Sequence, residues 1–174
     1  GSRQQEIDKH WNILLKTTKI LKSFLPDLQI VVVKAPAITL PTIPENFRIE
    51  YDSKRALHYG SAAIIASGTA TLEAALSNIP FVVCYRMSSI TWGLLKMFTN
   101  VPYASMVNLI GNKKIVDEFL QKKMNAKNLS RALLPLLNDS TKRESMYLDF
   151  IKIKKMLGKP GVYDRLAREI LEKK

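Results

Sequence analysis

The stretch "SAAIIASGTATLEAAL", residues 61–76, predicts a strand, a tight turn and a helix in immediate succession. Residues 62–66 are small or β-branched and uncharged, as in a strand buried on both faces of a parallel sheet. Gly68 permits a tight turn, and a helix over 70–77 follows it. This turn would lie at the carboxyl end of a parallel strand, where open α/β sheets bind their ligands.

Strands and helices alternate through the rest of the chain. We expect strands over 28–33, 47–51 and 80–85, and helices over 4–24, 54–60 and 88–100. The apolar run "LQIVVV" (28–33) is typical of a strand covered on both faces. Three prolines exclude regular structure from 34–46, and Asp52 or Ser53 would cap the helix over 54–60.

The C-terminal third reads as helical from about residue 115 to the end, with breaks near 125, 138 and 158–161. The whole pattern predicts an α/β fold: a Rossmann-like parallel sheet with helices on both faces, followed by a C-terminal helical region.

Composition indicates a globular domain with a basic surface. The 174 residues are 47% hydrophobic and carry a net charge of +12, of which +8 falls in residues 111–174. The single cysteine, Cys84, lies in an apolar run and is expected to be a buried thiol. No stretch of about twenty apolar residues and no signal peptide is evident. The basic region favours either solvated helix faces or a non-catalytic binding module for anionic membrane or nucleic acid. Because the sequence lacks RNA-binding signatures such as aromatic stacking motifs, no nucleic-acid partner is expected.

Hydroxyl groups gather at the turn after residue 66. Ser67, Thr69 and Thr71, with the start of the following helix, would suit a phosphate group. Glu73 is the only acidic residue between 52 and 117 and could accept hydrogen bonds from a ribose diol. In the competing interpretation, Thr69 is an N-cap and Glu73 its capping-box partner. The spacing alone leaves both interpretations open.

Other candidate ligands follow later in the chain. Arg86 ends a predicted strand at the same sheet edge, where its guanidinium could clamp a phosphate. Asn108 falls in an expected loop. Glu118 and Gln121 are expected at the beginning of a helix, three residues apart and therefore on one face of it. Each of these residues, taken alone, is more often a surface residue. The two histidines have no metal-ligand partner at suitable spacing, so neither a metal nor another cofactor is expected.

Five segments together resemble one enzyme family. "GSRQQEI", "ASGTATLEAAL", "PFVVCYRMSSITW", "VPYASMVNLI" and "VDEFLQ", in this order and spacing, are similar to the C-terminal half of lipid-A-disaccharide synthase, a GT-B glycosyltransferase. The resemblance implies an inverting hexosyltransferase that joins UDP-2,3-diacylglucosamine to 2,3-diacylglucosamine 1-phosphate through a β-1,6 bond. The alternative within the same fold is the donor domain of a GT-B enzyme that acts on another UDP-sugar. It implies a cytoplasmic enzyme, peripheral at the inner membrane.

The resemblance also implies roles for individual residues. Arg3, Arg86 and Asn108 would approach the donor diphosphate together with the turn of Ser67, Gly68, Thr69 and Thr71, and Glu73 would approach the ribose. Glu118 and Gln121 would lie near the sugar and diphosphate. Val107 and Asp117 stand where the family usually has proline, which weakens the assignments of Asn108 and Glu118.

The same resemblance sets expectations for organisation. Residues 1–138 would form the UDP-sugar-binding domain, and the helices of 139–174 would cross to an N-terminal domain that supplies the acceptor pocket and the general base. The chain alone would then be inactive. A Gly-Ser-Arg turn normally follows a strand, so we expect a first strand to be missing and a homodimer or a poorly stable domain to result. The apolar segment 90–98 is expected to pack in the core, with a membrane patch as the alternative.

Overall fold

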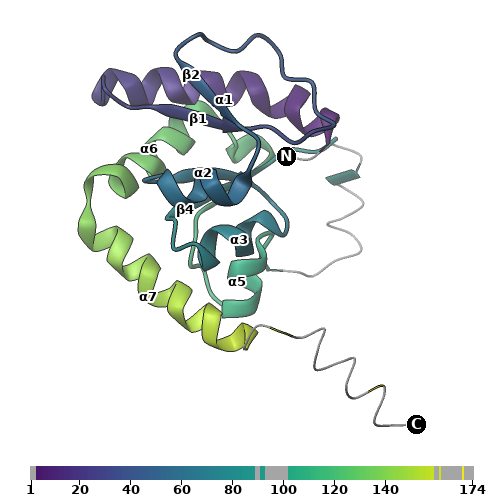
Figure 1. Ribbon diagram of the computed structural model, residues 1–174, viewed down its shortest axis with the longest axis vertical. Coiled ribbons are helices and arrows are strands. Elements are labelled where there is room, and N and C mark those ends of the chain that lie inside the picture. The colour runs from purple at the N-terminus through teal and green to yellow at the C-terminus, as the bar shows by residue number, and fades with distance from the viewer. Residues whose placement is uncertain (1–2, 89–90, 93–101, 159–160, 162–169, 171–174) are drawn as a thin grey trace.

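Five parallel strands in two separate sheets form the centre of the described chain (Figure 1). The computed structural model describes residues 3–88, 91–92, 102–158, 161 and 170. The strands are β1 (Ile30–Val33), β2 (Phe47–Glu50), β3 (Ala63–Ala66), β4 (Phe81–Tyr85) and β5 (Glu118–Leu120). The helices are α1 (Gln4–Phe24), α2 (Ser53–Tyr59), α3 (Ala70–Leu76), α5 (Met106–Gly111), α6 (Ala126–Asn138) and α7 (Ser140–Leu157), with a 3₁₀ turn, η1, at Gln121–Lys123.

The register of each sheet follows the apolar runs of the sequence. In the smaller sheet, β1 pairs with β2, with Ile30 opposite Phe47. In the larger sheet the order is β3-β4-β5, with Ala63 opposite Phe81 and Val83 opposite Glu118. All pairs are parallel, which confirms the predicted α/β fold.

Strand β4 is the centre of the main core. Its residues Phe81 to Cys84 are each at most 2% exposed, because helices cover both faces of a central parallel strand. The Phe81 ring stacks on Phe150 of α7, with 5.6 Å between the ring centroids. Burial raises the pKa of the Cys84 thiol to about 12, so Cys84 is the buried, protonated thiol that its apolar neighbours predict.

The helices form two layers. Helix α1 packs along α6, which also contacts β4, whereas α3, α5 and α7 pack on one another. Figure 1 shows α1 across the top of the molecule and α7 along its lower left, with α2, α3 and α5 stacked between them.

Local sequence signals account for the element boundaries. The Asp52 carboxylate accepts hydrogen bonds from the N–H groups of Lys54 and Arg55, and so caps α2 as expected. Residues 34–46 form no helix or strand, in agreement with their three prolines. Helix α1 spans the predicted residues and ends before Pro26.

The strand over 28–33 was wrongly predicted to be covered on both faces. Val32 packs with Ile7 and Trp11 of α1 in a small apolar cluster, but Val31 and Val33 are 44% and 45% exposed. Alternate residues of a strand point to opposite faces. Helix α1 therefore covers one face of β1, while the other face of the strand stays open to solvent.

The region after Asp117 was also predicted wrongly as helix. Glu118 begins the short strand β5 beside β4, and Gln121 opens η1 with a positive φ of 51°. Asn108, expected in a loop, lies in helix α5, which Ser105 caps by accepting a hydrogen bond from the Asn108 N–H. In both places the tertiary hydrogen bonds of polar side chains outweigh the local pattern.

Two expected helical segments lie largely outside the described residues. Of the segment 88–100, only 91–92 are described as helical, so the core and membrane interpretations of 90–98 remain predictions. The same holds for most of the chain after residue 158. Within the described ranges, no helix is long and apolar enough to cross a bilayer.

Candidate functional site

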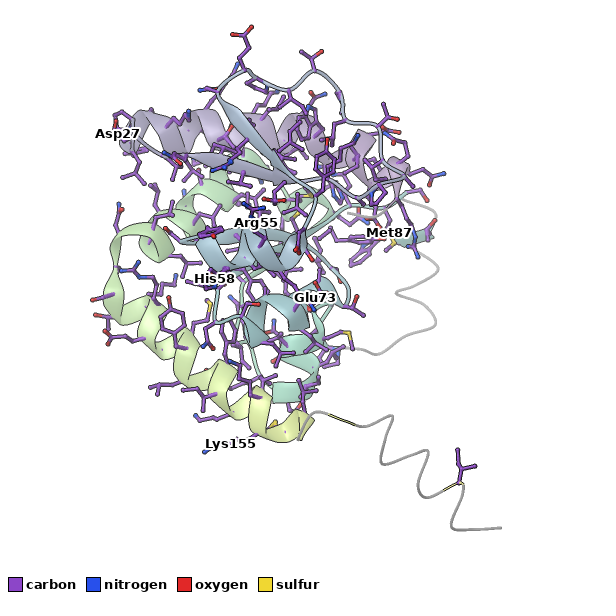
Figure 2. The ribbon with its side chains drawn as sticks, viewed as in Figure 1. Asp27, Arg55, His58, Glu73, Met87 and Lys155 are labelled. Atoms are coloured by element: carbon purple, nitrogen blue, oxygen red, sulfur yellow. The ribbon has the colours of Figure 1, made fainter. Side chains whose placement is uncertain are left out.

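The predicted site residues converge on one edge of the larger sheet. Ser67, Arg86 and Gln121 are the first residues after β3, β4 and β5, respectively. Because these strands are parallel, the three residues lie at the same carboxyl edge, the usual ligand-binding edge of an open α/β sheet. Figure 2 shows Met87, just beyond β4, on the opposite side of the molecule from Asp27, which precedes β1.

The turn after β3 is held by its own hydroxyl groups. The Ser67 hydroxyl donates to the Ala104 carbonyl at 2.7 Å, and the Thr71 hydroxyl donates to the Gly68 carbonyl at 2.7 Å. Gly68 has a φ of 141° and no atom within 4 Å of the position where a Cβ would stand. Ser67 and Thr71 therefore shape the turn, and Gly68 leaves its outer side open.

Thr69 and Glu73 do not form the capping arrangement that was the alternative to a ligand site. Thr69 has helical φ and ψ angles and makes no side-chain cap bond, and its side chain is exposed. The exposed Glu73 carboxylate instead accepts a hydrogen bond from the Ser53 hydroxyl at 3.3 Å. Figure 2 shows Glu73 on α3, close to α2. Both residues are therefore accessible to a ligand at this edge.

Asn108 and Glu118 are engaged in holding the loops of the site. The buried Asn108 amide accepts from the N–H groups of Ile115 and Val116, at 2.8 and 2.9 Å, and donates to the Val116 carbonyl. It also donates to Glu118 at 2.8 Å. The Glu118 carboxylate in turn accepts from the backbone of residues 104 and 105, at 2.8 and 2.9 Å.

This network connects directly to the turn after β3, because Ala104 also accepts the Ser67 hydroxyl. Asn108, Glu118 and Ser67 thus fix the position of the edge through protein contacts. In this arrangement the three residues position the loops of the site. Their contact with a ligand remains a prediction.

Arg86 and Gln121 join the ends of β4 and β5. The Arg86 guanidinium donates to the carbonyl groups of Gln121 and Met124, at 3.3 and 3.5 Å. The side-chain amide nitrogen of Gln121 donates a hydrogen bond to the Met87 carbonyl, and its oxygen accepts one from the Met87 N–H, both at 3.3 Å. Only one guanidinium nitrogen is used in these contacts, so Arg86 retains donors for an anion.

The start of α1 is attached to the same edge. The Tyr85 hydroxyl donates to Glu6 at 3.3 Å, and Glu6 lies 3.8 Å from the exposed Arg3 guanidinium. Burial raises the pKa of Tyr85, and the Glu6 charge adds to this effect. Arg3 is therefore placed beside the end of β4, and the contact with the donor diphosphate that the resemblance implies for it remains a prediction.

His10 is a contributor that the sequence analysis did not assign to the site. Its Nε2 atom accepts a hydrogen bond from the Arg86 backbone N–H at 2.9 Å, and its side chain is buried. Burial lowers its pKa below the ordinary 6.5, so the imidazole is neutral and can accept this bond at neutral pH. Its spacing, three residues after Ile7 on the apolar side of α1, was the signal that it is buried.

Other hollows lie away from this edge. One, of about 310 Å³, is lined by residues 24–28, Ser61 and the end of α6. Another, of about 420 Å³, lies between α1 and residues 44–47. Neither includes a predicted site residue. Among the described residues, no group of three or more His, Cys, Asp or Glu side chains is arranged to hold a metal.

Comparison with known proteins gives one consistent result. The family model described as lipid-A-disaccharide synthetase matches residues 1–167. Lipid-A-disaccharide synthase 1 of Legionella pneumophila (strain Philadelphia 1) is 34% identical over 99% of this chain and 48% of its own length. The lipid-A-disaccharide synthase of Myxococcus xanthus is 31% identical over 99% of this chain and 47% of its own. The corresponding protein of Acidobacterium capsulatum is 35% identical over 71% and 32%.

The chain therefore spans about half the length, or less, of the curated relatives it matches.

Proposed function

The chain belongs to the lipid-A-disaccharide synthetase family, and from this premise we propose that it is the donor-binding half of the enzyme. The donor would be UDP-2,3-diacylglucosamine and the acceptor 2,3-diacylglucosamine 1-phosphate, joined by a β-1,6 bond with inversion. The observation that carries the proposal is the convergence of Arg3, Arg86, Thr69 and Glu73 on one sheet edge. Two are cations, suited to a diphosphate, and Glu73 is an acceptor, suited to hydroxyl groups.

The site residues divide into two groups by their existing contacts. Ser67, Asn108 and Glu118 already bond to protein groups and hold the loops. Thr69, Glu73 and Arg3 are exposed, and Arg86 has donors to spare. We assign direct ligand contact to this second group, with the two arginines at the diphosphate and Glu73 at the ribose.

The chemical contribution of this half is leaving-group stabilisation. When the sugar leaves UDP, negative charge develops on the diphosphate, and preorganised cations at that position lower the barrier. Deprotonation of the acceptor hydroxyl needs a general base, which we assign to a part of the enzyme outside this chain. On this proposal residues 1–138 bind the donor, 139–174 contact the other part, and the chain alone is inactive.

Location follows from the substrates in this proposal. Both are acylated sugars, which favours an enzyme that works as a peripheral protein at a membrane surface, and the resemblance to the family implies the cytoplasmic face of the inner membrane. The +8 net charge of residues 111–174 would favour an anionic lipid surface.

Calorimetric titration of the chain with UDP, with ADP as the control nucleotide, at two salt concentrations tests the donor site. We expect saturable binding that prefers UDP and persists at the higher salt. Binding to any polyanion that falls steeply with salt, without preference for UDP, would instead indicate a nonspecific basic module for membrane or nucleic acid.

Glu73→Gln tests the ribose role without disturbing the fold, because the exposed carboxylate makes only one long side-chain bond, to Ser53. Glutamine keeps one acceptor oxygen, but it replaces a charged acceptor, worth about 1.5–3 kcal/mol per hydrogen bond, by a neutral one worth about 0.5–1.5 kcal/mol, so UDP affinity should fall roughly fivefold. Glu144→Gln, at an exposed position on α7, is the matched control and should bind as the parent does. Equal affinity in both variants would refute the assignment of Glu73.

A further inference from the structure

The main chain just after β4 is held by a side chain of helix α1. The pairing of β4 with β3 and with β5 ends before Arg86. Successive N–H groups of a strand point to opposite sides in the plane of the sheet, and that of Val83 donates to Asp117 on the side of β5. The Arg86 N–H therefore points to the side of β3, where its acceptor in the described chain is the His10 Nε2 atom, at 2.9 Å.

The Arg86 side chain has weaker support than its main chain. Its guanidinium donates to the carbonyl groups of Gln121 and Met124 at 3.3 and 3.5 Å, longer than the usual N–H···O distance of about 2.9–3.0 Å. The shorter main-chain bond to His10 therefore sets the direction in which the Cα–Cβ bond of Arg86 points. The guanidinium keeps its remaining donors for an anion.

The His10 ring is itself fixed by packing. Its side chain is buried, and its ring meets the Tyr85 ring edge to face, with 5.9 Å between the ring centroids. The Tyr85 hydroxyl donates to Glu6, one turn before His10 on α1. Helix α1 and strand β4 together therefore define the position of the His10 Nε2 atom.

Burial also keeps the ring in the form that accepts a hydrogen bond. Burial lowers the pKa of His10 and outweighs the opposing effects of the Arg86 carbonyl and the Glu6 charge, whereas the Arg86 charge acts in the same direction as burial. A protonated imidazole carries a hydrogen on both nitrogens and accepts no hydrogen bond. At neutral pH the His10 Nε2 atom is therefore free to accept from Arg86.

We propose that His10 is a positioning residue of the donor site, which fixes the main chain of Arg86 and so directs its guanidinium to the diphosphate. This role rests on the proposed function, which puts Arg86 at the diphosphate, and it adds a residue that acts without touching the ligand. A side chain that only fills space in the core would have no such effect on the ligand. The property that separates His10 from such a side chain is its acceptor nitrogen.

Two substitutions separate the acceptor from the bulk of the ring. In His10→Gln the side-chain amide oxygen can take the place of the Nε2 atom and accept from Arg86. In His10→Leu the buried side chain is apolar and the acceptor is gone. Thr17→Val is the matched control, because Thr17 is buried two turns later on the same helix, where its hydroxyl donates to the Ile13 carbonyl at 2.8 Å.

UDP affinity is measured by calorimetry in the chain and in the three variants, and urea unfolding confirms that each is folded. We expect His10→Leu to weaken UDP binding by about tenfold, the effect of one misdirected charge-assisted hydrogen bond. His10→Gln and Thr17→Val should bind as the chain does. If His10→Leu does not fold, His10→Met takes its place, because methionine adapts to irregular gaps in a core.

A double-mutant cycle tests whether His10 acts through Arg86. In an Arg86→Gln background, His10→Leu should cause no further loss of UDP affinity, because both residues serve one contact. Equal losses in His10→Gln and His10→Leu, no loss in His10→Leu, or the same loss again in the Arg86→Gln background would overturn the proposal.

Amide hydrogen exchange at Arg86, measured by NMR without nucleotide, separates this role from the proposed function. We expect His10→Leu to speed the exchange by about tenfold or more, and His10→Gln and Thr17→Val to leave it slow. If the chain does not bind UDP, the proposed function fails, and the exchange rates still decide whether His10 holds the Arg86 main chain. Equal exchange in His10→Gln and His10→Leu overturns the positioning role, whatever the result with UDP.

Discussion

Replacing Asn108 with alanine should destabilise the domain strongly, because this side chain makes four hydrogen bonds while fully buried. The substitution leaves the N–H and carbonyl groups of Val116 and the N–H of Ile115 without these partners, and it removes one of the donors to the Glu118 carboxylate. Each buried polar group without a partner costs about 1–3 kcal/mol. Val116 is buried, whereas Ile115 and Glu118 lie nearer to solvent, where water can replace part of the loss. We therefore expect a cost of about 3–5 kcal/mol, a large share of the roughly 5–15 kcal/mol typical of a domain.

Urea unfolding, followed by circular dichroism, measures this cost as a shift of the midpoint at constant slope. Asn12→Ala is the matched control, because Asn12 is exposed in the middle of α1. It should change the free energy of unfolding by no more than about 0.5 kcal/mol. A loss below about 1 kcal/mol in Asn108→Ala would show that the network does not hold the loops, and would refute the division of the site residues into positioning and contact groups.

Two other groups give predictions that follow from their burial. The free energy of unfolding should fall as the pH drops below 6.5 toward the lowered pKa of His10, because the unfolded state binds a proton before the native state does. This one group changes the free energy of unfolding by at most about 1.4 kcal/mol per pH unit. Urea titrations at several pH values should therefore show a weaker pH dependence of that free energy in His10→Asn. The same pH dependence in both proteins would contradict a neutral, buried imidazole. Burial raises the pKa of the Cys84 thiol to about 12. In the native protein this thiol should therefore resist a disulfide reagent at pH 8, and it should react once the chain is unfolded in denaturant. Rapid labelling without denaturant would contradict its burial.

Polar residues in the second half of the chain illustrate where sequence reasoning failed. Residues 115–121 have apolar residues at helical spacing, yet Glu118 is drawn to the backbone of residues 104 and 105 and extends beside β4. Asn108 serves the same loops from α5. Neither contact has a signature in local spacing, because the partners are seven to fourteen residues apart and meet only in the folded chain.

The location of the candidate site could be predicted from the sequence, but the contacts of its residues could not. Ser67 and Arg86 follow strands whose apolar runs are evident, and parallel strands bring their carboxyl ends to one edge. Gln121 reaches the same edge through β5, a strand that the sequence pattern did not predict. Which of the predicted ligands are already occupied by protein groups depends on the packing of loops around that edge. His10 joined the site because the burial of one face of α1 placed it against the end of β4.

Local sequence was enough to predict the helices α1, α2 and α3, the proline-rich connection and the apolar strands, because these depend on spacing, caps and backbone restrictions within a few residues. The open face of β1, the division of the strands into two sheets and the loop-holding contacts of Asn108 and Glu118 are visible only in the folded chain. Those outcomes depend on which groups find partners across the fold, since a buried polar group or a strand edge is satisfied by whatever segment packs beside it.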